Sequence, residues 1–199
     1  MVVKPKYAYF LYRLVTLALI CRRRVRTEGW TASLEWASRV YADRRSRIRL
    51  GWRVYVKCRV NIEAYDGGLI DIGAYTFINK DCSIVARQTI RIGRDCLIGD
   101  GVSIYDHNHR TDDPGIPYRL QGYVGRPVHI GDNVWIGAKS FIGAGVSIGD
   151  GAVIGAHTIV TKNVPARTVA YGRTELVLRS LVDQDGAQEP GPWRMMHAR

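Results

Sequence analysis

Residues Val128 to Val160 read VHIGDNVWIGAKSFIGAGVSIGDGAVIGAHTIV, and an aliphatic side chain returns at every sixth position of this stretch. These positions are Ile130, Ile136, Ile142, Ile148, Ile154 and Val160. An amphipathic helix repeats about every 3.6 residues and a half-buried strand about every two, so neither element explains the period. The same spacing occurs upstream, at Ile72, Ile78 and Ile84 and again at Ile92, Ile98 and Ile104.

A compact residue stands four positions after the aliphatic one, and glycine often follows the aliphatic residue directly. The compact residues are Thr76, Cys82, Cys96, Val102, Val134, Ser140, Val146, Ala152, Thr158 and Val164. A short strand that ends in a tight corner points one large side chain inward and leaves room for only a small one at the fifth position. Three such strands close a triangular coil of about 18 residues, and coils stack at the ~4.8 Å spacing of neighbouring strands. We therefore predict an all-β fold, a parallel β-helix over residues 53–180.

Two irregularities interrupt this repeat. Ile84 and Ile92 are eight positions apart, which predicts a small outward bulge of the coil. Ile104 and Ile130 are 26 positions apart, which leaves residues 105–128 as a loop that projects from the stack. Two of the five histidines, His107 and His109, stand at the start of this loop.

The four cysteines contain no CxxC pair and no zinc-ligand spacing. Cys82 and Cys96 occupy the compact position of the repeat, so we expect them to fill the core rather than to react. No small-residue cleavage pattern follows the apolar stretch near the N-terminus, which argues against a signal peptide. Reduced thiols and the lack of that pattern predict a cytoplasmic protein.

The first 52 residues are basic, and we expect them to be mainly helical. Residues 1–50 hold 12 Lys/Arg against 3 acids, a local charge of +9 in a chain of net charge +11. From Thr31 to Arg49, apolar side chains recur at helical spacing, and Thr31 is available as a cap. At the other end, residues 181–199 lack periodicity and predict a flexible tail.

The clustered Lys and Arg side chains could bind nucleic acid, an anionic membrane surface or phosphorylated small molecules, or could simply face water. We expect no nucleic-acid partner. The stretch from Tyr7 to Cys21 is apolar but shorter than the ~20 residues that span a bilayer. With its basic flank it fits a helix lying at the inner face of the membrane. The alternative is a helix that packs on the β-helix or on another subunit.

The segment Ile104-Tyr105-Asp106-His107-Asn108-His109 and the repeats of Gly125 to Gly172 together resemble the hexapeptide-repeat acetyltransferases. Within that family the likeness is greatest to galactoside and maltose O-acetyltransferases and to surface-polysaccharide O-acetyltransferases. The resemblance implies a left-handed coil, acetyl-CoA as co-substrate with no metal required, and a homotrimer whose active sites lie between subunits. It also implies acetyl transfer to a sugar hydroxyl, in surface-polysaccharide or glycoconjugate biosynthesis.

By this resemblance the catalytic histidine lies five residues after Ile104, at His109, whereas a one-gap alignment would select His107. A sugar hydroxyl is a poor nucleophile, so its proton must leave as the new bond forms, and imidazole suits this general-base role. The resemblance implies direct attack on acetyl-CoA without an acyl-enzyme. Asp106 or another carboxylate could orient the imidazole.

Further site residues follow from the same resemblance. Asn79 matches a residue that contacts the acceptor, although a purely structural corner asparagine is the alternative. Ala138 and Ala156 are 18 positions apart, hence on one face of adjacent coils, where small side chains would admit the pantetheine arm of CoA. The remaining matches to CoA-binding positions are Thr161, Lys162 and Arg179. Trp135, on the strand after the loop, is expected to line the acyl end of the cofactor site, and the alternative is a surface aromatic that covers a subunit contact.

Two other functions fit the fold. A zinc-dependent hydratase of the γ-carbonic anhydrase type would use three histidines from adjacent coils, with His107, His109 and His129 as candidates. A non-catalytic trimeric scaffold would need none of these side chains.

Overall fold

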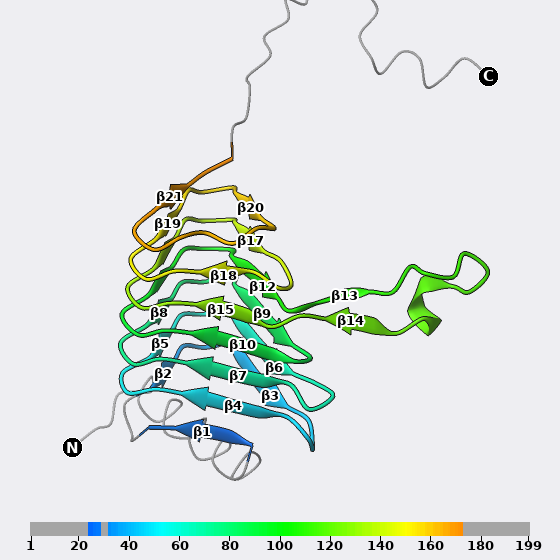
Figure 1. Cartoon of the computed structure of the whole chain (residues 1–199). Coiled ribbons are helices and arrows are strands. Elements are labelled where there is room, and N and C mark those ends of the chain that lie inside the picture. Colours follow the sequence, from blue (N-terminus) through cyan, green and yellow to red (C-terminus); the bar gives the residue numbers. More distant parts are fainter. Residues whose placement is uncertain (1–23, 29–31, 173–199) are drawn as a thin grey trace, which may run out of the picture.

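The computed structural model describes residues 24–28 and 32–172, which form a left-handed parallel β-helix with three faces (Figure 1). Sheet A holds β1 (Val25–Thr27), β4 (Arg47–Leu50), β7 (Leu69–Ile72), β10 (Thr89–Ile92), β15 (Val128–Ile130) and β18 (Ser147–Ile148). Sheet B holds β2 (Ser33–Leu34), β5 (Tyr55–Val56), β8 (Phe77–Ile78), β11 (Leu97–Ile98), β16 (Trp135–Ile136), β19 (Val153–Ile154) and β21 (Val169–Ala170). Sheet C holds β3 (Arg39–Ala42), β6 (Asn61–Ala64), β9 (Ser83–Ala86), β12 (Ser103–Tyr105), β17 (Phe141–Ile142) and β20 (Ile159–Val160).

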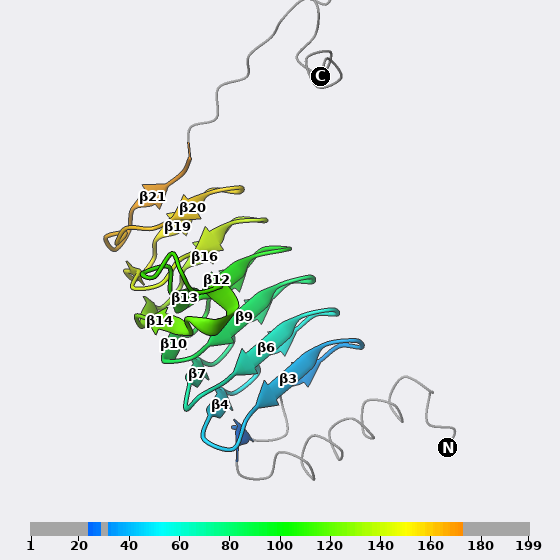
Figure 2. The same cartoon turned by 90° about the vertical axis from the view of Figure 1, so that its right-hand side faces the viewer.

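The chain visits the three sheets in the order A, B, C, so each coil has an A/B, a B/C and a C/A corner (Figure 2). The sixth-position aliphatic side chains lie in register on neighbouring coils, as Ile98 does opposite Ile78 and Ile136. Their side chains are buried and form one continuous core along the axis. The predicted parallel β-helix of hexapeptide repeats is therefore confirmed.

The compact positions of the repeat also lie inside, and all ten are buried. Their polar members bond to the next coil: the Thr76 hydroxyl donates to the Gly93 carbonyl at 2.8 Å, and the Ser140 hydroxyl to the Gly155 carbonyl at 2.8 Å. At the A/B corner the backbones of neighbouring coils nearly touch. A Cβ built at Gly73 would lie 2.5 Å from the Gly93 carbonyl carbon, which explains why glycine follows the aliphatic residue there.

The prediction of a helix from Thr31 to Arg49 is wrong, because the described part of this segment forms strands β2, β3 and β4. Among the described residues the β-helix is therefore already present at Val25, upstream of the predicted start at residue 53. Leu34 and Val40, which suggested helical spacing, are also six residues apart, and they pair with Val56 and Ile62 of the next coil. Ala37 lies between them with φ of 58° and is exposed, as a corner residue and not as part of a helix face.

In the first half of the β-helix the C/A corner contains more residues than the other corners, so the six-residue period is not visible in the sequence there. Four-residue strands flank this corner in β3 and β4 and again in β6 and β7, with alternating burial that a six-residue period does not describe. The apolar stretch Tyr7 to Cys21, Arg179 and the expected tail 181–199 lie outside the described residues. Within residues 24–28 and 32–172, no helix is long and apolar enough to cross a membrane.

Candidate active site

The loop of residues 105–128 projects from the C/A corner, as expected, and it is built as a hairpin (Figure 1). Its strands β13 (His107–His109) and β14 (Tyr123–Gly125) pair in antiparallel fashion, with His107 opposite Gly125 and His109 opposite Tyr123. A short 3-10 helix, η2 (Tyr118–Leu120), lies near the tip. Both histidines therefore stand at the base of the hairpin, next to the β-helix.

Asp106 anchors this base from inside the protein, since its side chain is fully buried. Its two carboxylate oxygens accept hydrogen bonds from the backbone amides of Arg87 at 2.9 Å and Gln88 at 2.8 Å. These two residues form the corner between β9 and β10, where the sequence shows eight positions instead of six between aliphatic residues. The small bulge thus presents two amides to the carboxylate of the next coil.

The imidazole of His107 lies against the same carboxylate, with 3.0 Å between its Nδ1 and Asp106 Oδ1. Its side chain is only 11% exposed and contacts the rings of Tyr105 and Tyr123. A carboxylate at this distance favours the tautomer that carries its proton on Nδ1, because the N–H can then donate to it. His107 is therefore fixed in orientation and mostly covered.

His109 differs from His107 because it is exposed. Its ring centroid lies 4.5 Å from that of Tyr123, and its imidazole forms no hydrogen bond with another described residue. An accessible, unengaged ring can receive a proton from a molecule that approaches the hairpin.

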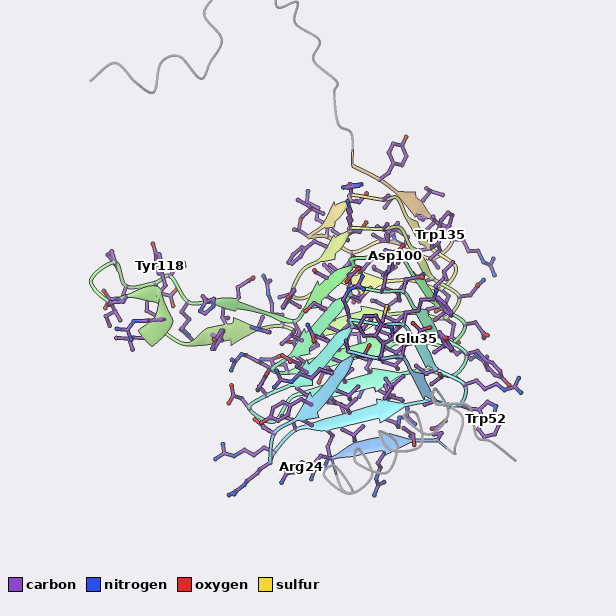
Figure 3. The ribbon with its side chains drawn as sticks, turned by 180° about the vertical axis from the view of Figure 1, so that it is seen from behind. Arg24, Glu35, Trp52, Asp100, Tyr118 and Trp135 are labelled. Atoms are coloured by element: carbon purple, nitrogen blue, oxygen red, sulfur yellow. The ribbon has the colours of Figure 1, made fainter. Side chains whose placement is uncertain are left out.

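Other predicted site residues lie at a different corner. Ala138 follows β16 and Ala156 follows β19, so they occupy adjacent coils of the B/C corner, as their spacing predicted. Trp135 is 52% exposed on the outer face of sheet B, and Figure 3 shows it on the opposite side of the coil from Tyr118 of the hairpin. Asn79 also follows a strand of sheet B, and its side-chain amide donates to the Ile98 carbonyl at 3.1 Å.

Thr161 and Lys162 follow β20 and are exposed at the C/A corner, where the hairpin also begins. The sequence-predicted residues thus divide into two groups within one chain. The histidines, Asp106, Thr161 and Lys162 belong to the C/A corner, and the alanine pair, Asn79 and Trp135 belong to the B/C side.

The three histidines of the zinc alternative do not form a ligand group in the chain. His129 lies on β15 between Arg91 and Ser147, on the outer face of sheet A. In residues 24–28 and 32–172 there is no cluster of three or more His, Cys, Asp or Glu side chains that could hold a metal ion.

The two core cysteines are buried, as expected. Burial raises the pKa of the Cys82 thiol to about 11, and it also raises the pKa of Cys96. A thiol with a raised pKa is a poor nucleophile at neutral pH, so both side chains serve packing.

Sequence reasoning missed three residues of this site: Arg87, Gln88 and Tyr123. The guanidinium carbon of Arg87 lies 3.5 Å from the centroid of the Tyr123 ring. The eight-position gap between Ile84 and Ile92 marked the place of the first two residues. The gap does not indicate that Arg87 and Gln88 contact the loop. The loop has no repeat, so its path cannot be predicted from the sequence.

Comparisons with known proteins agree with the fold and with the repeat. A family model described as Bacterial transferase hexapeptide (six repeats) matches residues 127–162. A probable acetyltransferase of Mycobacterium tuberculosis is 32% identical over 135 residues, which cover 68% of this chain and 45% of that protein. The galactoside O-acetyltransferase of Escherichia coli is 39% identical over 123 residues, which cover 60% of this chain and 58% of that protein.

A solved structure shares the architecture. It is a hexapeptide-repeat-containing acetyltransferase of Vibrio cholerae in complex with acetyl-CoA, 25% identical, with a TM-score of 0.55 over 86% of this chain and 79% of that one. The fold and the repeat define a left-handed hexapeptide-repeat β-helix. Residues 127–162 thus match the repeat of hexapeptide transferases, and the three relatives named above are described as acetyltransferases. The chain spans about half the length of the curated relatives it matches, 45% of the Mycobacterium tuberculosis protein and 58% of the Escherichia coli one.

Proposed function

We propose that the protein is an acetyl-CoA-dependent O-acetyltransferase that acts on a sugar hydroxyl. One observation carries the proposal: an exposed imidazole, His109, stands at the base of a projecting hairpin beside a second imidazole that a buried carboxylate fixes. The names of the matched relatives, among them a galactoside O-acetyltransferase and a protein complexed with acetyl-CoA, support the same chemistry.

In the proposed reaction the acceptor oxygen attacks the carbonyl carbon of the thioester directly. His109 takes the hydroxyl proton as the O–C bond forms, the C–S bond then breaks, and the imidazolium returns the proton to the departing CoA sulfur. General-base catalysis of this kind contributes about 10²–10⁴ in rate. His109 suits the role better than His107, because a ring that is 11% exposed offers little room for an acceptor. His107 and Asp106 would hold the base of the hairpin in place.

The same proposal assigns the CoA-binding positions. The small side chains of Ala138 and Ala156 leave the backbone of the B/C corner open to an extended pantetheine arm. Trp135 would line the acyl end, and Thr161 and Lys162 would contact the CoA arm near its nucleotide. Arg179, outside the described residues, would bind the adenosine phosphates, since a guanidinium suits an anionic group.

We further propose a homotrimer, in which these two groups of residues meet across subunit boundaries. Within one chain the histidines and the alanine pair belong to different corners of the coil. The hairpin tip also exposes the apolar side chains of Ile116, Tyr118 and Leu120, which a neighbouring subunit would cover. Asn79 would contact the acceptor from such a neighbour.

The setting that we propose is the cytoplasmic side of a membrane, in the synthesis of a surface polysaccharide or glycoconjugate. The first coils carry exposed arginines, including Arg26, Arg44, Arg45 and Arg47. Basic side chains near an anionic lipid surface contribute about 1 kcal/mol each to binding. The apolar sequence from Tyr7 to Cys21 would add a hydrophobic contact.

A thiol-release assay with acetyl-CoA tests this function across free sugars, nucleotide sugars and polysaccharide fragments. We expect release of free CoA that depends on a saccharide, together with a product that is heavier by one acetyl group and is cleaved by mild base, as an ester is. Calorimetry with acetyl-CoA is the companion measurement. Failure to bind acetyl-CoA would favour the scaffold function, and a base-stable product would show acetylation of an amine instead.

A further inference from the structure

The side chain of Arg87 occupies an unusual position for a charged group. Its guanidinium carbon lies 3.5 Å from the centroid of the Tyr123 ring and 5.6 Å from that of Tyr65. The side chain is 22% exposed and forms an ion pair with Asp66 through Nη1. Its Nε is buried, and no hydrogen-bond partner for it is found among the described residues. Burial of a cation costs free energy, and the faces of aromatic rings offset part of that cost.

The Tyr123 ring that Arg87 contacts also touches both histidines. Its centroid lies 4.5 Å from that of His109 and 5.4 Å from that of His107. Tyr123 is directly opposite His109 in the β13–β14 pair, so the strand register holds these two side chains next to each other. A movement of the Tyr123 ring would therefore change the surroundings of His109.

The corner formed by Arg87 and Gln88 also contacts the two hairpin strands directly, where β13 begins and where β14 ends. The amides of Arg87 and Gln88 bind the carboxylate of Asp106, which immediately precedes β13. The side chain of Gln88 packs against β14, where a Cβ built at Gly125 would lie 2.8 Å from Gln88 Cγ. The Arg87–Gln88 corner thus contacts both ends of the hairpin where it leaves the β-helix.

We propose that Arg87 is a positioning residue, which fixes the imidazole of His109 by stacking on Tyr123. The inference rests on the proposed function, in which His109 removes the proton from the acceptor. Arg87 itself touches neither reacting group in this arrangement. Its contribution is to keep the Tyr123 ring, and with it the base, in one orientation. Small displacements of a catalytic group lower the rate strongly, because the reacting atoms must be aligned.

A double-mutant cycle on kcat tests the coupling. We expect Arg87→Met and Tyr123→Leu each to lower kcat about 10-fold, and the double variant to be no slower than either single variant. Tyr123→Phe retains the ring and should keep kcat within about 3-fold of the wild type, with the KM for acetyl-CoA nearly unchanged throughout. Additive losses in the double variant, or an unchanged kcat for Arg87→Met, would overturn the inference.

Arg39→Met is the matched control. Arg39 also stacks on a tyrosine, with 5.1 Å between its guanidinium carbon and the Tyr41 ring, and it pairs with Glu63 at 3.2 Å. It lies on β3, and its contacts with Tyr41 and Glu63 do not involve the hairpin, so its loss should leave kcat unchanged. An equal loss of kcat in this variant would show that the effect of Arg87 is one of general stability, which refutes positioning.

A second readout does not depend on activity. The chain has five histidines, so the imidazole Cε1–Hε1 signals of the labelled protein can be assigned with His→Gln variants. Arg87→Met should shift or broaden the signals of His109 and His107 and leave those of His129 and His157 in place. Unmoved His109 signals would overturn the inference. Signals that move while His109→Ala remains fully active would instead refute the proposed function.

Discussion

Nδ1 of His107 lies 3.0 Å from Oδ1 of Asp106, whose carboxylate also accepts the backbone amides of Arg87 and Gln88. The carboxylate is fully buried, so these partners replace water entirely. Asp106→Asn replaces one acceptor oxygen by an NH₂ group. This donor would then face another donor, either a backbone amide or the Nδ1–H of His107. We expect this change to lower the free energy of unfolding by about 2–3 kcal/mol, measured by urea denaturation.

Asp112→Asn serves as the control for that measurement, since Asp112 is exposed in the same loop and pairs with Arg110 at the surface. Its effect should stay within about 0.5 kcal/mol. If Asp106→Asn were equally mild, the carboxylate would not be the anchor of the hairpin.

The packing of the first coils can be tested through Leu50, which is fully buried on β4 and pairs with Thr27 of the first coil and Ile72 of the third. Leu50→Ala should cost about 2–5 kcal/mol of unfolding free energy, because the surrounding coils close only part of the cavity. Thermal or urea unfolding should show this loss in the same single transition as the rest of the β-helix. A separate transition, or no loss, would mean that residues 25–50 do not fold with the remaining coils.

Asp43 predicts a pH dependence of stability. A hydrogen bond from the Ser46 hydroxyl, together with backbone amides of Asp66, Arg45 and Ser46, lowers the pKa of the Asp43 carboxyl to about 2. A depressed pKa in the folded state stabilises the protein above the unfolded value of about 3.8 and ceases to do so as the pH falls toward 2.

We therefore expect the Tm difference between the wild type and Asp43→Asn to be constant from about pH 7 to pH 5 and to shrink below about pH 4. Scanning calorimetry across this range is the measurement. A Tm difference that persists undiminished near pH 2 would show that the carboxylate charge does not stabilise this corner.

The fold could be predicted from the sequence wherever the period of six holds, because one buried side chain per strand and one compact residue per corner leave few alternatives. Ile130 to Val160 is the clearest case, and every aliphatic position in it is buried. The prediction failed from Thr31 to Arg49, where a wider C/A corner separates Val40 from Leu50. There the six-residue spacing of Leu34 and Val40 was indistinguishable from two turns of helix over so short a stretch.

The site could be predicted only in part, since a repeat determines which residues stack but not where an inserted loop lies. The stacking of Ala138 and Ala156 follows directly from their spacing. The contacts of Arg87 with Tyr123 and of Gln88 with Gly125 join a coil corner to a hairpin strand, and no periodicity links these positions. The division of the predicted residues between two corners likewise depends on which sheet each strand joins, and the sequence alone does not show this.

The role of His109 is tested most directly by comparing kcat for His109→Ala and His107→Ala in the saccharide-dependent thiol-release assay. We predict that His109→Ala lowers kcat by at least ~10² with little change in the KM for acetyl-CoA, whereas His107→Ala has a clearly smaller effect. If His107→Ala shows the larger loss and His109→Ala remains active, His109 is not the base and the proton is taken by the imidazole that Asp106 holds.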